Sequence, residues 1–375
     1  MTVPTDPIEP VVDPGAEPAT GSSAGLGRST ALMASGTAVS RVLGVLRGTM
    51  LVWAISLNGN AANAFAQANK LPNILYLLVA GGVLNSVLVP QVVRAYRRAN
   101  GQEYVDRLLT LGIALLLGLG VVLTIAAPFL IGFYSDIPDP AVSALAVLFA
   151  YWCIPQMFFY GLYSLLGQVL NARGSFGPYM WAPVVNNVVS MAGLGVFIAV
   201  NGPFSNHEAM FNDPAWWGAP QITLLAGTFT LGVVAQALVL VIPLYRSGFR
   251  YRPRWGFRGV GLRTAGRVAY WTFLGLLVGQ VGVWVVNLAT TASKSNNLYD
   301  NAFLIFMLPH SIVTVSLMTA LFTRLSARAA AEDVDAVRAD LSLGLRTVGL
   351  FTVLATALIA LLALPIGRVL FPTER

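Results

Sequence analysis

Long apolar stretches without charge alternate with short polar segments along most of the chain. Six windows of 21 residues or more contain no Asp, Glu, Lys or Arg, namely residues 108–133, 140–172, 214–245, 268–293, 301–323 and 347–367. A helix of about 20 apolar residues crosses the hydrocarbon core of a bilayer, so each window is long enough to span it. Strands of a transmembrane barrel would instead alternate in polarity over about 10 residues. The pattern predicts an all-α polytopic membrane protein.

Nine transmembrane helices are expected from these windows and the polar breaks between them. They cover approximately residues 30–57, 64–93, 107–134, 141–171, 178–200, 220–245, 266–292, 301–324 and 342–364. The spans group into four regions: a disordered tail (1–28), a first lobe of six helices (29–246), a basic linker (247–265) and part of a second lobe with three helices (266–375).

Composition agrees with this class of protein. The chain has 56% apolar and 10% charged residues and a mean hydropathy of +0.70, whereas soluble domains carry about 25% charged residues. His207 and His310 stand alone, and no Walker, nucleophile-elbow or paired-carboxylate pattern occurs. The single cysteine, Cys153, excludes a disulfide within the chain. No enzymatic activity, cofactor or metal is expected.

The distribution of basic residues predicts the orientation in the membrane. Of the 23 Lys and Arg residues, 17 lie in the tail or in the second, fourth, sixth and eighth connections, and three lie on the opposite side. Cytoplasmic loops carry such an excess, so the N-terminus is expected in the cytoplasm of the cell. The arginine-rich stretch 246–267 is interpreted as this topology signal and as a contact with anionic membrane lipids, rather than as a nucleic-acid site.

Three cations fall inside expected spans: Arg41, Arg47 and Lys70. A charge at membrane depth is costly and normally faces a protein interior or a water-filled cavity. Arg41 and Arg47 lie on one face of their helix, and Lys70 shares a stripe with Asn63 and Gln67. The pattern predicts a shared cationic cavity, with snorkelling of the side chains to an interface as the alternative.

No acidic residue lies well inside a span, and Asp300 is placed at a boundary. A cavity with three positive charges and no acid should prefer an anion. Because the remaining faces of these helices are apolar, that anion could be attached to a lipid. Coupling to an ion or to the membrane potential is left open by the sequence.

Several motifs resemble the MurJ (MviN) family of lipid II flippases, within the multidrug/oligosaccharidyl-lipid/polysaccharide exporter superfamily. The similar segments are Ser40–Arg47, Ala62–Phe65, Lys70–Asn73, Val89–Pro90, Leu170–Phe176, Ala182–Asn186 and the helix from Pro309 to Ser326. Together they cover most of residues 29–371. The proline-rich tail fits actinobacterial members of the family.

This resemblance implies a transporter that moves undecaprenyl-pyrophosphate-linked peptidoglycan precursor from the inner to the outer leaflet of the cell membrane. Two six-helix lobes would rock about a central cavity. The essential arginines of the family map onto Arg41 and Arg47, and its lysine maps onto Lys70. We expect these three to bind the diphosphate, with Asn63 and Gln67 as hydrogen-bonding neighbours.

The chain also departs from the family pattern. Asn63, Tyr76, Gly81 and Leu304 stand where an acid, an arginine, a glutamate and an arginine are expected. Nine spans are fewer than the twelve to fourteen of the family, so the native gene is expected to continue for about three to five further spans. Alternatives are a flippase for another polyprenyl-linked glycan, a scaffold that recruits cell-wall or division proteins through the tail, and a membrane glycosyltransferase.

Overall fold

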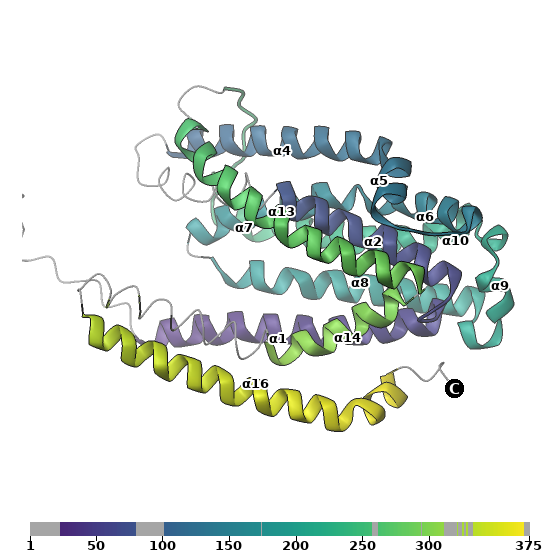
Figure 1. Ribbon diagram of the computed structural model, residues 1–375. Coiled ribbons are helices and arrows are strands. Elements are labelled where there is room, and N and C mark those ends of the chain that lie inside the picture. The colour runs from purple at the N-terminus through teal and green to yellow at the C-terminus, as the bar shows by residue number, and fades with distance from the viewer. Residues whose placement is uncertain are drawn as a thin grey trace, which may run out of the picture.

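The computed structural model is built from helices (Figure 1). It describes residues 23–79, 101–173, 175–256, 262–293, 295–310, 321, 325, 328 and 333–370. Every regular element in these residues is helical, which confirms the expected all-α class. The tail before residue 23, Gly81, the Val89–Pro90 motif and residues 311–320 of the eighth expected span lie outside the described residues.

The principal helices follow the expected spans closely. They are α1 (Ser23–Ile55), α2 (Asn60–Val79), α4 (Gly101–Ile125), α5 (Ala127–Tyr134), α6 (Pro140–Cys153), α7 (Gln156–Ala172), α8 (Gly177–Asn201), α11 (Thr228–Leu238), α12 (Val241–Arg246), α13 (Leu262–Ala292), α14 (Asn296–Pro309) and α16 (Val334–Leu370). Short elements between α8 and α11 are η2 (Phe204–Asn206), α9 (Glu208–Asn212), η3 (Pro214–Trp216), α10 (Ala219–Ile222) and η4 (Thr223–Gly227).

Seven helical segments of the described residues are long and apolar enough to cross a membrane, and the shorter Leu298–Pro309 is apolar as well. The second and eighth expected spans are described only in part, so the total of nine stays a prediction. The last helix begins at Val334, eight residues before its expected start. Asp333 explains the earlier start, because its carboxylate accepts a hydrogen bond from the Ala336 amide at 3.0 Å.

The first lobe is held together by apolar packing at both of its ends. One cluster centres on Phe65, Phe149 and Phe197, and it is covered by the segment between α8 and α11 through the buried Phe211. Cys153 is fully buried in the same cluster, as expected of a small apolar side chain. A second cluster joins α4, α7 and α12. Helix α2 packs against α6 and α7, and α1 packs against α8 (Figure 1).

The start of the expected linker is attached to the first lobe. Arg254 Nη1 lies 2.8 Å from Glu103 Oε1 at the beginning of α4, and Arg107 Nη2 lies 2.6 Å from the same oxygen. Thr110 Oγ1 accepts the Arg254 amide at 3.1 Å and lies 2.9 Å from the Tyr251 hydroxyl oxygen. Residues 247–256 therefore fold back on α4, and the division into regions otherwise stays a prediction.

Replacing Glu103 with Gln should release this segment. The three charged groups are partly exposed, and exposed ion pairs are worth about 0.2–1 kcal/mol each. We expect trypsin to cut after Arg250 and Arg254 about two to five times faster in Glu103→Gln, measured on detergent-solubilised protein. Glu208→Gln, an equal charge change on α9 at the opposite end of the helices (Figure 1), should leave the rate unchanged. Equal rates in both variants would show that the ion pairs do not anchor the segment.

Candidate functional site

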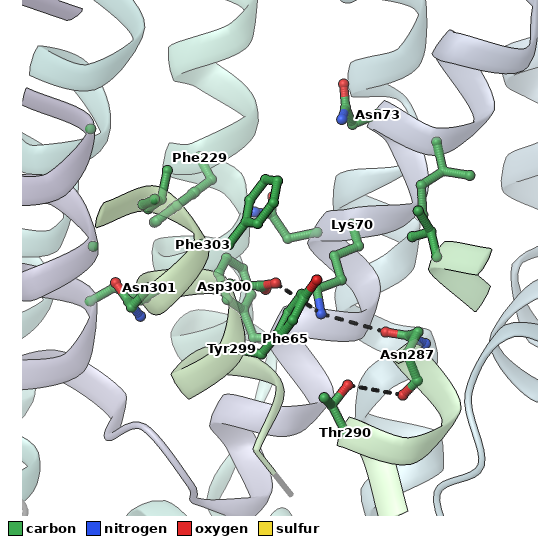
Figure 2. Close-up of a pocket in the computed structure, with 18 of the residues that line it drawn as sticks. Phe65, Lys70, Asn73, Phe229, Asn287, Thr290, Tyr299, Asp300, Asn301 and Phe303 are labelled. Atoms are coloured by element: carbon green, nitrogen blue, oxygen red, sulfur yellow. Dashed lines mark hydrogen bonds and ion pairs between the residues drawn. The ribbon is translucent and has the colours of Figure 1, made fainter. Parts of the chain in front are cut away.

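Two adjacent cavities lie between the first lobe and α14, and the larger also reaches α13. The larger has a volume of about 460 Å³, and its lining includes Arg47, Lys70 and Asp300 (Figure 2). The smaller has a volume of about 310 Å³, and its lining includes Arg41 and Arg47. Gly44, Arg47 and Leu304 line both cavities. Arg47 thus stands at the junction between them.

The two arginines come from one face of α1, as the helical spacing predicts. Both are half-buried. The guanidinium carbon of Arg47 lies 5.5 Å from the centroid of the Phe229 ring, a distance at which a cation is attracted to an aromatic face. Gly48 allows α14 to approach this face, because a Cβ at Gly48 would lie 2.5 Å from Asn301 Oδ1. Gly48 therefore lets α14 lie close to the helix face that carries the arginines.

Lys70 reaches from α2 toward the helices that follow the linker. Its Nζ lies 3.1 Å from Asp300 Oδ1 on α14 and 3.5 Å from Asn287 Oδ1 on α13. Figure 2 shows the Lys70 side chain directed between these two oxygen atoms. The side chains of Lys70 and Asp300 are 20% and 36% exposed. An ion pair thus joins the first lobe to the following helices at the cavity wall.

The expectation of a cavity without an acid is wrong. Helix α14 begins at Asn296, five residues before the expected span, so Asp300 lies within its first turns and faces the larger cavity. The charge of Lys70 is therefore compensated by Asp300. Among the described lining residues, the arginines Arg41 and Arg47 supply the remaining positive charge.

Asn63 and Gln67 line neither cavity. Both are buried, and Gln67 is fully so. Gln67 Nε2 donates to Thr291 Oγ1 at 2.6 Å, and its Oε1 accepts from Asn287 Nδ2 at 2.8 Å. The polar stripe on α2 is therefore divided: Lys70 lines the cavity, whereas Gln67 is part of the contact between α2 and α13. Sequence spacing placed these residues on one face without showing which helix covers it.

Several residues in or next to the cavity walls were not predicted from the sequence or differ from the family pattern. Asn187 Nδ2 donates to the Ser40 carbonyl oxygen at 2.9 Å, beside Arg41. In the sequence, the adjacent Asn186 and Asn187 within an apolar span were the signal that could have indicated this polar contact. Leu304, which stands in place of an expected arginine, lines both cavities. Tyr76 stands in place of another arginine and packs against Tyr160, with ring centroids 6.0 Å apart. Leu304 makes the walls of both cavities more apolar than an arginine would.

The fold is that of a helical membrane transporter. It matches a solved lipid II flippase MurJ in an inward closed conformation with a TM-score of 0.69, at 18% identity over 91% of this chain and 67% of that one. It matches an inward-facing multidrug resistance MATE transporter with a TM-score of 0.68, at 16% identity over 89% of this chain and 73% of that one.

The family model for lipid II flippase MurJ matches residues 58–373, so the chain belongs to the MurJ family. Relatives named probable lipid II flippase MurJ include those of Haemophilus influenzae (26% identical over 89% of this chain) and a Synechocystis species (25% over 93%). The chain spans 66% and 65% of the length of these two relatives. The expected resemblance is confirmed.

A double-mutant cycle should detect the Lys70–Asp300 ion pair. Lys70→Ala and Asp300→Ala each leave one charge without its partner, so each should lower thermal stability in detergent. The double variant should be less destabilised than the sum of the two, by about 1 kcal/mol, because solvent screens a pair that is partly exposed. Lys70→Ala combined with Asp335→Ala, on α16, should be additive. A cycle that is additive for Asp300 as well would contradict the pairing.

Proposed function

We propose that the protein moves lipid II, an undecaprenyl-diphosphate-linked peptidoglycan precursor, between the leaflets of the cell membrane. The observation that carries the proposal is the pair Arg41 and Arg47, which line adjacent cavities from one membrane-spanning helix. Membership of the MurJ family supports lipid II as the substrate, and the fold supports transport rather than catalysis.

The arginines suit a diphosphate for a chemical reason. The planar guanidinium group can donate two parallel hydrogen bonds to phosphate oxygens, and it stays protonated in proteins. Phe229 limits the orientations of Arg47, so less freedom is lost when the anion binds. Apolar lining residues such as Leu51, Ile74 and Phe303 offer contacts to the first isoprenoid units.

Lys70 connects substrate binding to the position of the helices. Its ammonium group is held by Asp300 across the boundary of the first lobe. A diphosphate in the larger cavity competes with Asp300 for this cation. Binding therefore weakens a contact between the first lobe and α14, which is what a rocking motion of the lobes requires.

Loss of either arginine should weaken binding of lipid II. Hydrogen bonds to charged groups contribute about 1.5–3 kcal/mol, so Arg41→Ala and Arg47→Ala should each weaken binding roughly tenfold or more, and Lys70→Ala similarly. Arg41→Lys should fall between wild type and Arg41→Ala, because it keeps the charge and loses the planar fork. The measurement is native mass spectrometry with lipid II, alongside complementation of a flippase-depleted bacterium.

Arg246→Ala is the matched control, since Arg246 is an exposed arginine at the end of α12. It should bind lipid II as wild type does. Gln67→Ala should affect stability more than binding. If the three cavity variants bind and complement like wild type, the cavity does not hold the substrate.

Another polyprenyl-diphosphate glycan is a second candidate, because the charged lining residues would contact the diphosphate that such lipids share. Competition between lipid II and undecaprenyl diphosphate distinguishes the two. A large preference for lipid II requires contacts to the sugar or the peptide. Cell-wall synthesis or division proteins remain candidate partners, and deletion of residues 1–22 tests whether the tail recruits them.

The orientation with the N-terminus in the cytoplasm belongs to the same proposal. Three basic connections gather at one end of the helices: Arg254 contacts Glu103, and Arg173 donates to the Ser247 carbonyl oxygen. This clustering supports a single cytoplasmic face.

Cysteine labelling from outside intact cells should distinguish the two faces. A membrane-impermeant maleimide should label Ser205→Cys, at the α9 end of the molecule, and should label Arg252→Cys only after permeabilisation. The native Cys153 is buried and serves as the background. Strong labelling of Arg252→Cys in intact cells would reverse the orientation.

A further inference from the structure

A buried tyrosine hydroxyl in the wall of the larger cavity makes no hydrogen bond to the part of the chain that the structure describes. Tyr134 ends α5, is 7% exposed and lines this cavity. Within the described residues its buried hydroxyl oxygen has no hydrogen-bond partner, whereas its carbonyl oxygen accepts from Asn287 Nδ2 at 2.9 Å. Buried hydroxyl groups are nearly always hydrogen-bonded, so an exception calls for a physical reason.

A carboxylate lies in the wall of the same cavity. Asp300 is close enough to Tyr134 for an electrostatic interaction, and both residues line the same cavity. In the present arrangement Asp300 is held by Lys70 at 3.1 Å (Figure 2). The Tyr134 hydroxyl is a donor that this arrangement does not use.

The need for that donor arises when Lys70 moves. A carboxylate that loses its cation inside a membrane protein is strongly disfavoured unless another donor replaces it. A tyrosine hydroxyl is protonated at neutral pH and can donate its proton in a hydrogen bond. Asn287, the other neighbour of Lys70, already donates both to Gln67 and to Tyr134.

We infer that Tyr134 is the alternative partner of Asp300, so that the carboxylate exchanges the Lys70 ammonium group for the Tyr134 hydroxyl when Lys70 binds a diphosphate. The part played by the diphosphate rests on the proposed function; the exchange itself does not. No proton is transferred, since the hydroxyl donates a hydrogen bond and keeps its proton. Tyr134 is thus a positioning residue that makes release of Lys70 from Asp300 less costly.

The first experiment needs no substrate. Lys70→Met mimics the departure of the ammonium group, and Tyr134→Phe removes only the hydroxyl. Alone, Tyr134→Phe should leave the melting temperature unchanged, because the hydroxyl has no partner among the described residues. Combined with Lys70→Met, it should lower the melting temperature by several degrees beyond Lys70→Met alone. Lys70→Gln replaces Lys70→Met if the latter does not accumulate in the membrane.

Tyr163→Phe is the matched control. The Tyr163 hydroxyl donates to the Tyr179 carbonyl oxygen at 2.9 Å, so its removal should have the same effect with and without Lys70→Met. If Tyr134→Phe also has the same effect in both backgrounds, the exchange is overturned.

The second experiment measures binding of undecaprenyl diphosphate by native mass spectrometry. Tyr134→Phe should weaken binding about five- to twentyfold, and less than twofold in an Asp300→Asn background, where no carboxylate needs compensation. Equal weakening in both backgrounds would overturn the exchange. The thermal cycle could show coupling while neither the wild type nor any variant binds undecaprenyl diphosphate. In that case the exchange is supported and the proposed function fails.

Discussion

The cost of an unpaired charge in a membrane governs the arrangement at the centre of this protein. Lys70 enters from α2 and is paired with Asp300 of α14 at 3.1 Å. The pair requires that the helices after the linker approach the first lobe at this depth. It also brings Asn287 to the same place, where its amide group bonds to Gln67 and to the Tyr134 carbonyl oxygen. The polar part of the cavity wall around Lys70 is therefore held by an ion pair and hydrogen bonds.

Packing in the first lobe makes this approach possible. Phe65 meets Phe149 and Phe229 edge-on, which holds α2, α6 and α11 at fixed distances. Phe229 in turn lies beneath Arg47, so the same aromatic cluster that supports the fold also orients a cavity cation. Gly48 lets α14 come close to α1. The shape of the cavity thus follows from the packed core of the first lobe and from the close contact of α14 at Gly48.

The two arginines and the lysine stand in different electrostatic situations. Lys70 has a carboxylate partner, whereas Arg47 has an aromatic neighbour that attracts a cation without neutralising it. An incoming anion is attracted most strongly to a cation whose charge is not already neutralised by a carboxylate. Arg41 and Arg47 therefore suit initial binding of the proposed diphosphate, and Lys70 suits a later step in which a contact between helix groups is exchanged.

The sequence by itself determined the features that depend on local geometry. Apolar windows predicted the membrane helices, and the helical repeat placed Arg41 and Arg47 on one face of α1, because both patterns are set within a few turns of one helix. The tertiary structure alone decided which helix covers each polar face. Gln67 and Lys70 share one stripe, yet Gln67 bonds to Thr291 and Lys70 pairs with Asp300. These partners lie more than 200 residues along the chain, and no local pattern in α2 specifies them.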